Sequence, residues 1–162
     1  MPHGTVIVIG GAEDKVRDRV ILGRFVALAG GRDARIAVIA TASSFGLETG
    51  ERYRSVFMEL GAAEVVPLNA TTRMQANDEH AARIVSEASG IFMTGGNQLR
   101  LSSMIAGTRI ADAIMERFMA GAVVAGTSAG ASAVSSHMIA FGASGATPKH
   151  RMAQIAAGLG LL

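Results

Sequence analysis

The sequence predicts an α/β fold in which a parallel sheet is covered by helices on both faces. Short apolar runs rich in β-branched residues alternate with longer amphipathic segments along all 162 residues. Strands and helices that alternate in this way form right-handed βαβ crossovers, which make the strands run parallel. Neither an internal repeat nor a linker divides the chain, so we expect a single domain over 1–162.

The first half of the chain is expected to contain three strands and two helices. Runs of β-branched and other apolar residues predict buried strands over 5–9, 35–40 and 64–68. Asp14 is a candidate cap for a helix over 16–29, which a pair of glycines would end. A second helix is expected over about 48–60, ended by Gly61.

The second half continues the alternation. Asn77 or Asp78 is expected to cap a helix that runs to about Ser89. Two further strands are expected from the apolar runs over 90–93 and 120–125. Helical sequence runs between these two strands, over 98–106 and 108–119.

The loops that follow the predicted strands indicate where a ligand would bind. In open parallel sheets, ligands bind at the carboxyl ends of the strands. Four such loops are rich in glycine or hydroxyl groups, at 10–15, 41–46, 94–98 and 126–130. Because the strands are expected to be parallel, all four loops should lie at one edge of the sheet.

The last of these loops reads Gly126-Thr127-Ser128-Ala129-Gly130, a G-x-S-x-G directly after an apolar run. This pattern is typical of a nucleophile elbow, a sharp strand-to-helix turn that lifts a serine hydroxyl out of the sheet. The alternative is a turn of small residues that only packs a helix on the sheet. The position of the pattern after a strand favours a nucleophilic Ser128.

A serine nucleophile also needs donors for the developing oxyanion. The amide of Ala129 is one candidate, because it opens the helix that follows the serine. The loop Gly95-Gly96-Asn97, one strand away, could supply a second amide, although it could also be a plain glycine turn.

The base is harder to assign among the four histidines. His3 precedes the first strand and is expected at the opposite edge of the sheet, and His80 is expected to be solvated. His137 should lie near the far end of the elbow helix and point away from the site. His150 lies in a polar loop that could reach Ser128, but an exposed loop histidine is the simpler interpretation.

Other classes of site and partner find little support. The chain has no cysteine, which excludes disulfides, thiolate zinc sites and a cysteine nucleophile. Histidines and carboxylates do not occur at metal-ligand spacing, so we expect no metal or other cofactor. The loop 10–15 lacks the spacing of a phosphate-binding loop, and Glu13 and Asp14 would repel phosphate.

Charge and hydropathy argue against nucleic acid and membrane partners. The net charge is +2 and the arginines are scattered along the chain. The segment 118–148 lacks charged residues but is interrupted by glycines and hydroxyl groups, so it would insert poorly into a bilayer. We therefore expect a cytoplasmic protein.

Four motifs together resemble a known family. They are Gly10-Gly11-Ala12-Glu13-Asp14-Lys15, Ile39-Ala40-Thr41-Ala42-Ser43, Phe92-Met93-Thr94-Gly95-Gly96-Asn97-Gln98-Leu99 and Gly126-Thr127-Ser128-Ala129-Gly130-Ala131. In this order and spacing they resemble the cyanophycinases, which share a serine peptidase family with the aspartyl dipeptidases (peptidase E). The resemblance covers essentially the whole chain.

The resemblance implies a flavodoxin-like, three-layer fold related to class I glutamine amidotransferase domains. It implies a homodimer that hydrolyses cyanophycin, a polyaspartate with arginine on each side-chain carboxyl, to β-Asp-Arg dipeptides. Ser128 would be the nucleophile, Gly96 and Ala129 would form the oxyanion hole, and Gln98 and Asn97 would bind the substrate. The alternatives are an α-aspartyl dipeptidase and an inactive chain that binds the polymer or a partner.

The chain departs from the family in one respect. By the same resemblance, the catalytic histidine, substrate-binding arginines and a supporting acid follow a stretch like the one at 158–162, where this sequence stops. We therefore expect the chain to be the N-terminal part of a longer catalytic domain, with the base outside it. Leu161 and Leu162 would then begin another strand.

Overall fold

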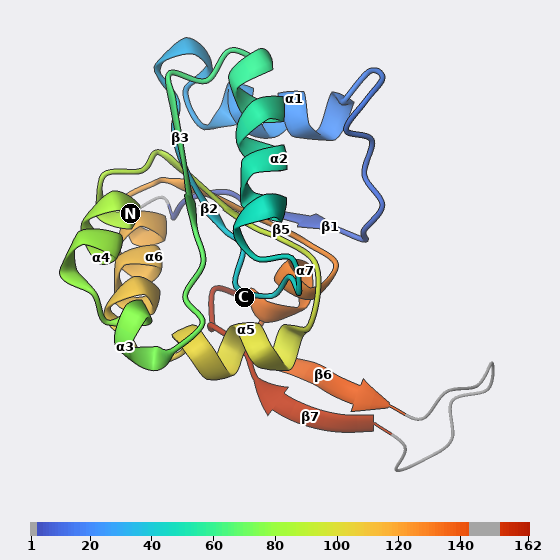
Figure 1. The fold of residues 1–162 in the computed structure, drawn as a ribbon, viewed down its shortest axis with the longest axis vertical. Coiled ribbons are helices and arrows are strands. Elements are labelled where there is room, and N and C mark those ends of the chain that lie inside the picture. The colour runs from blue at the N-terminus through green and yellow to red at the C-terminus, as the bar shows by residue number, and fades with distance from the viewer. Residues whose placement is uncertain (1–2, 143–152) are drawn as a thin grey trace.

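The computed structural model describes residues 3–142 and 153–162, which form a central parallel sheet with helices on both faces (Figure 1). The strand order is β1-β5-β4-β2-β3, and each neighbouring pair is parallel. A separate antiparallel pair, β6 and β7, projects from one end of the molecule. The predicted α/β class is confirmed.

The strands of the sheet lie close to their predicted positions. They are β1 (Val6–Ile9), β2 (Arg35–Ile39), β3 (Glu64–Leu68), β4 (Gly90–Met93) and β5 (Val123–Thr127). Strand β5 begins three residues later than the apolar run over 120–125. The reason is that Ala120 caps the preceding helix and Gly121 turns the chain with a φ of 101°.

The helices also follow the predicted order. They are α1 (Val20–Leu28), α2 (Leu47–Glu59), α3 (Arg73–Ala76), α4 (Glu79–Ser86), α5 (Gln98–Ile105), α6 (Arg109–Met119) and α7 (Ala129–Ala133), with a 3-10 turn at η1 (Gly31–Asp33). The sequence did not predict α3, which Thr72 caps by accepting the amide of Gln75. Asp78 caps α4 in the same way, through the amide of Ala81. None of the helices in the described ranges is long and apolar enough to cross a bilayer.

The prediction for the first helix was wrong at its start. Asp14 accepts hydrogen bonds from the amides of Val16, Arg17 and Arg19, so it closes a turn and not a helix. Arg19 has a left-handed backbone, with a φ of 49°, and α1 begins only after it. Because three amides stabilise its charged form, the pKa of Asp14 falls to about 2.

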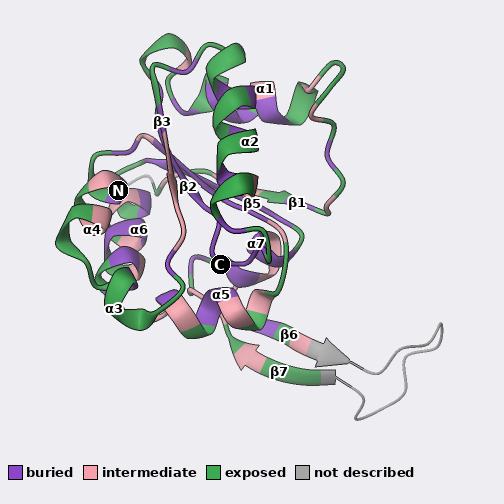
Figure 2. Cartoon of the chain, in the orientation of Figure 1, coloured by how far each residue is buried: buried purple, intermediate pink, exposed green. Residues whose placement is uncertain are grey.

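The core has two layers, one on each face of the sheet, and Figure 2 shows the buried strands between them. On the face covered by α1 and α2, four aromatic rings pack together, with centroids 4.6–5.8 Å apart. They belong to Phe25, Tyr53, Phe57 and Phe92. The opposite face is aliphatic apart from Phe118 and is covered by residues from α4, α5, α6 and α7.

The hairpin of β6 (His137–Gly142) and β7 (Ala153–Ala157) corrects one prediction about the C-terminal part of the chain. His137 does not lie in the elbow helix, because α7 ends at Ala133 and His137 opens β6. Leu161 and Leu162 are in no strand of the described residues, and their place at the start of a strand in a longer domain stays a prediction. Their amides both donate to the carbonyl of Val134, which places the Leu161 side chain in the core.

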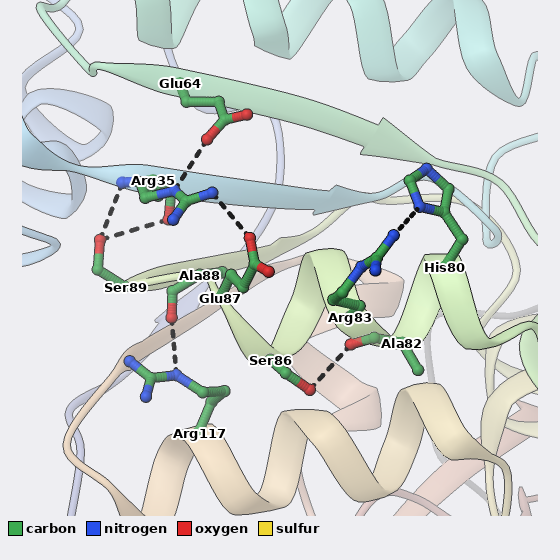
Figure 3. Close-up of polar contacts among 10 residues, drawn as sticks. All are labelled: Arg35, Glu64, His80, Ala82, Arg83, Ser86, Glu87, Ala88, Ser89 and Arg117. Carbon is green, nitrogen blue, oxygen red and sulfur yellow. Dashed lines mark hydrogen bonds and ion pairs between the residues drawn. The ribbon is translucent and has the colours of Figure 1, made fainter.

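Polar contacts tie several elements together where the strands of the sheet begin (Figure 3). The guanidinium of Arg35 on β2 lies 2.8 Å from Glu64 and 2.9 Å from Glu87. Its pKa is raised, chiefly by the hydrogen bond to Glu64. Nearby, Nε of Arg117 on α6 donates to the carbonyl of Ala88 at 2.8 Å. These contacts connect β2, β3, the turn after α4, and α6 at the edge opposite the predicted site.

We expect Phe92→Ala to lower the free energy of unfolding by about 3–5 kcal/mol. The ring is fully buried at the centre of the aromatic cluster, so its removal leaves a cavity among three other rings. Urea denaturation followed by circular dichroism measures the change. Met74→Ala is the control, because that side chain is 81% exposed and its loss should change stability by less than about 0.5 kcal/mol. Equal effects of the two substitutions would contradict the packing described.

Candidate active site

The four glycine- and hydroxyl-rich loops meet at the carboxyl edge of the sheet, as predicted. The register aligns the strand ends, with Ile9 paired to Thr127 and Met93 paired to Gly126. Loops 10–15 and 94–98 both reach Ser128, since a Cβ on Gly11 or on Gly95 would lie 3.3 or 3.4 Å from its Cβ. Loop 41–46 joins them through the amide of Asn97, which donates to the carbonyl of Ala42 at 2.9 Å.

Ser128 occupies the single residue between β5 and α7. Its backbone has a φ of 52° and a ψ of −110°, a conformation that non-glycine residues rarely adopt. Such strain persists only where the surrounding structure imposes it, and it is the conformation of a strand-to-helix nucleophile elbow. The serine is exposed while its neighbours on both sides are buried. The turn therefore presents one hydroxyl at the edge of the sheet.

The two glycines of the motif allow α7 to lie against the sheet. A Cβ on Gly126 would collide with the carbonyl of Gly130, and one on Gly130 would collide with the carbonyl of Met93. The turn is therefore both a nucleophile elbow and a turn of small residues that packs a helix on the sheet, the two interpretations that the sequence left open. The glycines pack a helix on the sheet, and that packing holds the serine in its strained conformation.

Two hollows open on either side of Ser128. The α2-side hollow has a volume of about 300 Å³ and is lined by Gly11, Ala12, Glu13, Lys15, Thr49, Arg52, Tyr53, Gly95, Thr127 and Ser128. The α7-side hollow has a volume of about 390 Å³ and is lined by Val8, Ile9, Gly10, Gln98, Ser128, Ala129, Ala131 and Ser132. Ser128 is shared by both, so a substrate that extends across it could occupy both sides.

Of the two proposed oxyanion donors, Ala129 directly follows the serine, and Gly96 follows Gly95, whose loop reaches Ser128. Ala129 is the first residue of α7, and Gly96 has a φ of 141° and packs tightly against the carbonyl of Ala42. Within the described ranges, no backbone carbonyl accepts a hydrogen bond from the amide of either residue. Their role as an oxyanion hole remains a prediction.

Asn97 and Gln98 make contacts within the protein that the sequence did not reveal. Oδ1 of Asn97 accepts the amide of Arg100 at 2.9 Å and so caps α5. Nε2 of Gln98 donates to the carbonyls of Ile139 and Ala140, at 2.9 and 3.1 Å, and so holds β6 against the start of α5. Gln98 also lines the α7-side hollow, and a contact of either residue with substrate remains a prediction.

The structure places a buried acid, Glu13, at the site. From the sequence, this residue was expected only to carry a negative charge that repels phosphate. The side chain of Glu13 is 1% exposed. It accepts hydrogen bonds from the hydroxyls of Tyr53 and Thr127, the latter at 2.5 Å, and lies 2.7 Å from Nζ of Lys15. Because this carboxylate is buried and bound by three donors, its negative charge is shielded from an anionic ligand in the hollow. The sequence feature that could have indicated this cluster is the presence of a Glu and a Lys in the same loop after a strand.

The titration of this cluster follows from burial and hydrogen bonding. Burial by itself raises the pKa of Glu13, but the bonds from Lys15, Thr127 and Tyr53 together outweigh it and lower the pKa below its usual value. Burial and the neighbouring carboxylate both raise the pKa of Tyr53. The acid is thus ionised and the phenol protonated at neutral pH, which is the arrangement that their hydrogen bond requires.

None of the described histidines lines either hollow beside Ser128. His3 stacks on Phe118 at the opposite edge of the sheet, as predicted, with ring centroids 6.1 Å apart. His80 is exposed on α4, 3.1 Å from the guanidinium of Arg83, and His137 is exposed at the start of β6. His150 lies outside the described residues. In the part of the chain that the structure describes, no cluster of three or more His, Cys, Asp or Glu side chains is placed to hold a metal ion.

Comparison with known proteins identifies close relatives. The chain matches peptidase family S51 over residues 6–162. It is 45% identical over 161 residues to a cyanophycinase of Geminocystis herdmanii, covering 99% of this chain and 59% of that protein. It is 42% identical over 158 residues to a cyanophycinase of Trichormus variabilis, covering 97% of this chain and 53% of that protein. The chain thus spans about half the length of the curated relatives it matches.

Two solved structures share the fold. A peptidase from an acI-B1 Actinobacterium superposes with a TM-score of 0.79 at 22% identity, covering 98% of this chain and 65% of that one. A putative peptidase E protein from Listeria monocytogenes superposes with a TM-score of 0.59 at 19% identity, covering 82% and 62%. At these identities the likeness supports the fold alone.

We expect Ser128→Gly to be more stable than Ser128→Ala by about 1 kcal/mol, because glycine adopts a positive φ without a Cβ penalty. Both variants lack the hydroxyl, so the difference reports backbone strain in chemical denaturation. The matched pair is Ser103→Gly and Ser103→Ala within α5, where glycine should be the less stable by about 1 kcal/mol. Equal stability of the two Ser128 variants would show that the turn is unstrained.

We expect the stability advantage of the wild type over Glu13→Gln to shrink in acid. Since the pKa of Glu13 is lowered in the folded state, its ionisation stabilises the fold above the usual pKa of 4.5. That contribution is lost as the pH falls through the lowered pKa. Thermal unfolding between pH 7 and pH 3 measures the difference, with the exposed Glu51→Gln as the control. A constant difference across this range would contradict the ionised carboxylate.

Proposed function

The chain belongs to peptidase family S51, and we propose that it carries the nucleophile of a serine-type hydrolase that cleaves cyanophycin to β-Asp-Arg dipeptides. The observation that carries this proposal is the exposed Ser128 in a strained turn at the carboxyl edge of a parallel sheet. The similarity to curated cyanophycinases supports the choice of substrate. We also propose that 1–162 is the N-terminal part of a longer catalytic domain, which the greater length of those relatives supports.

In the proposed reaction, Oγ of Ser128 attacks the carbonyl of a backbone peptide bond between two aspartyl residues. The amides of Gly96 and Ala129 donate to the oxyanion that forms, and its collapse expels the amine and leaves an acyl-enzyme. Water then attacks the acyl-enzyme and releases the carboxylate product. We propose that the base, which accepts the serine proton and passes it to the leaving amine, lies outside the described residues, because no described histidine lines either hollow.

The finer features of the protein are proposed on the same basis. We propose a cytoplasmic homodimer that acts on the polymer without nucleic acid or membrane partners, in line with the family resemblance and the scattered arginines. Asn97 and Gln98 are proposed to approach the substrate from the start of α5. An α-aspartyl dipeptidase is the alternative within the family, and the choice of substrate separates the two.

We expect the natural protein that contains this sequence to release β-Asp-Arg from purified cyanophycin, and Ser128→Ala to lower the rate by about 10³-fold or more. Mass spectrometry of the soluble products measures the release. Ser103→Ala, at an exposed site on α5, is the control and should leave the rate unchanged. The chain 1–162 alone should be slow or inactive.

Three outcomes would contradict this proposal. Full activity of Ser128→Ala would remove the serine from the mechanism. Hydrolysis of α-aspartyl dipeptides but not of cyanophycin would favour the dipeptidase. Binding of cyanophycin without hydrolysis of either substrate by the natural protein would favour the inactive, polymer-binding alternative.

A further inference from the structure

We propose that Lys15, held in place by Glu13 and Tyr53, is a binding subsite for a carboxylate of the substrate in the α2-side hollow. The inference rests on the proposed function and deepens it, because it names a chemical group that the site recognises. It is carried by three features of the described residues: a fixed ammonium group, a shielded acid, and a position beside the nucleophile.

The ammonium group of Lys15 is fixed on two sides. Nζ lies 2.7 Å from Oε1 of Glu13 and 5.1 Å from the ring centroid of Tyr53, over the face of the ring. It also donates to the carbonyl of Glu13 at 3.4 Å. A free lysine side chain loses considerable rotamer entropy when it binds a ligand. Here that entropy is already lost in the folded protein, so a ligand would meet a preorganised cation.

The acid that fixes Lys15 is shielded from the hollow. The side chain of Glu13 is 1% exposed, whereas that of Lys15 is 35% exposed. The carboxylate also accepts hydrogen bonds from Tyr53 and Thr127, which share its negative charge within the protein. A ligand in the α2-side hollow therefore meets the cation of the pair and not its anion.

A second cation lines the same hollow. Arg52 on α2 is exposed and lies 2.8 Å from Glu48, one turn away on the helix. Such exposed pairs contribute little to stability, so the guanidinium is free to turn towards a ligand. Lys15 and Arg52 are the two cations in a lining whose one carboxylate, Glu13, is buried. The accessible charge of the described wall is positive.

The position of Lys15 connects this charge to the reaction. Lys15 and Ser128 line one hollow of about 300 Å³, which is large enough for an aspartyl unit with part of its branch. In cyanophycin each arginine is attached through its amine, so its own carboxylate is free. A hydrogen bond from an ammonium to a carboxylate is charge-assisted and stronger than one between neutral groups. Lys15 would thus select substrates with a carboxylate close to the scissile bond.

Binding without turnover tests the proposal. The natural protein carrying Ser128→Ala is titrated calorimetrically with the β-linked aspartyl-arginine dipeptide and with its diamide, in which both carboxylates are carboxamides. We expect the dipeptide to bind about tenfold more tightly than the diamide. Adding Lys15→Met should reduce this preference to less than about twofold, and Lys15→Arg should retain most of it because the charge remains.

Further variants separate recognition from folding. Arg54→Met removes a cation that pairs with Glu51 on the same helix, and it should leave the preference unchanged. Glu13→Gln should weaken the preference, because the carboxylate that holds the ammonium is lost. In the protein with Ser128 intact, Lys15→Met should raise KM for cyanophycin and leave kcat nearly unchanged. Loss of a lysine that only stabilised the fold would not raise KM while leaving kcat nearly unchanged.

Several results would overturn the inference. One is equal binding of the dipeptide and the diamide, and another is no binding of either. The third is a preference for the dipeptide that persists in Lys15→Met when circular dichroism shows that this variant is folded. Cyanophycin hydrolysis by the wild type, measured in parallel, reports separately on the proposed function. If the wild type hydrolyses cyanophycin but binds the dipeptide no better than the diamide, the proposed function stands and only the Lys15 subsite is rejected.

Discussion

The close approach of α7 to the sheet is the constraint on which the rest of the site depends. Gly126 and Gly130 remove the two Cβ atoms that would collide with main-chain carbonyls, and the helix can then start directly after β5. The chain has one residue in which to turn, and Ser128 accepts a positive φ to make that turn. Exposure of the hydroxyl and the position of the Ala129 amide both follow from this packing.

A buried carboxylate provides the second constraint. Glu13 joins the loop after β1 to α2 through Tyr53 and to β5 through Thr127, the residue before the serine. Removing one partner from a buried charged cluster is destabilising because it leaves an uncompensated group. The loop, the helix and the elbow are therefore held as one unit. The same carboxylate holds Lys15 in the wall of the α2-side hollow and so fixes where the positive charge of that wall lies.

Much of the fold was predictable because its signals are local. Strand β4 and strand β3 have the predicted bounds, since a short apolar run next to glycine or a helix end leaves few alternatives. The start of α1 was not predictable in the same way, because Asp14 caps a turn as readily as a helix and Arg19 breaks the helical backbone. His137 was misplaced since small residues at 129–133 do not indicate where a short helix ends.

The sequence by itself determined the class of fold, the edge at which the loops gather, and Ser128 as the residue in the turn. These follow from hydrophobic periodicity, from the parallel direction that βαβ crossovers require, and from glycine spacing. Only the tertiary structure decided that Glu13 is buried, that Lys15 faces the hollow, and that Gln98 holds β6. Burial and pairing depend on elements such as α2 and β5, which lie far from Glu13 along the chain, so no local pattern could reveal them.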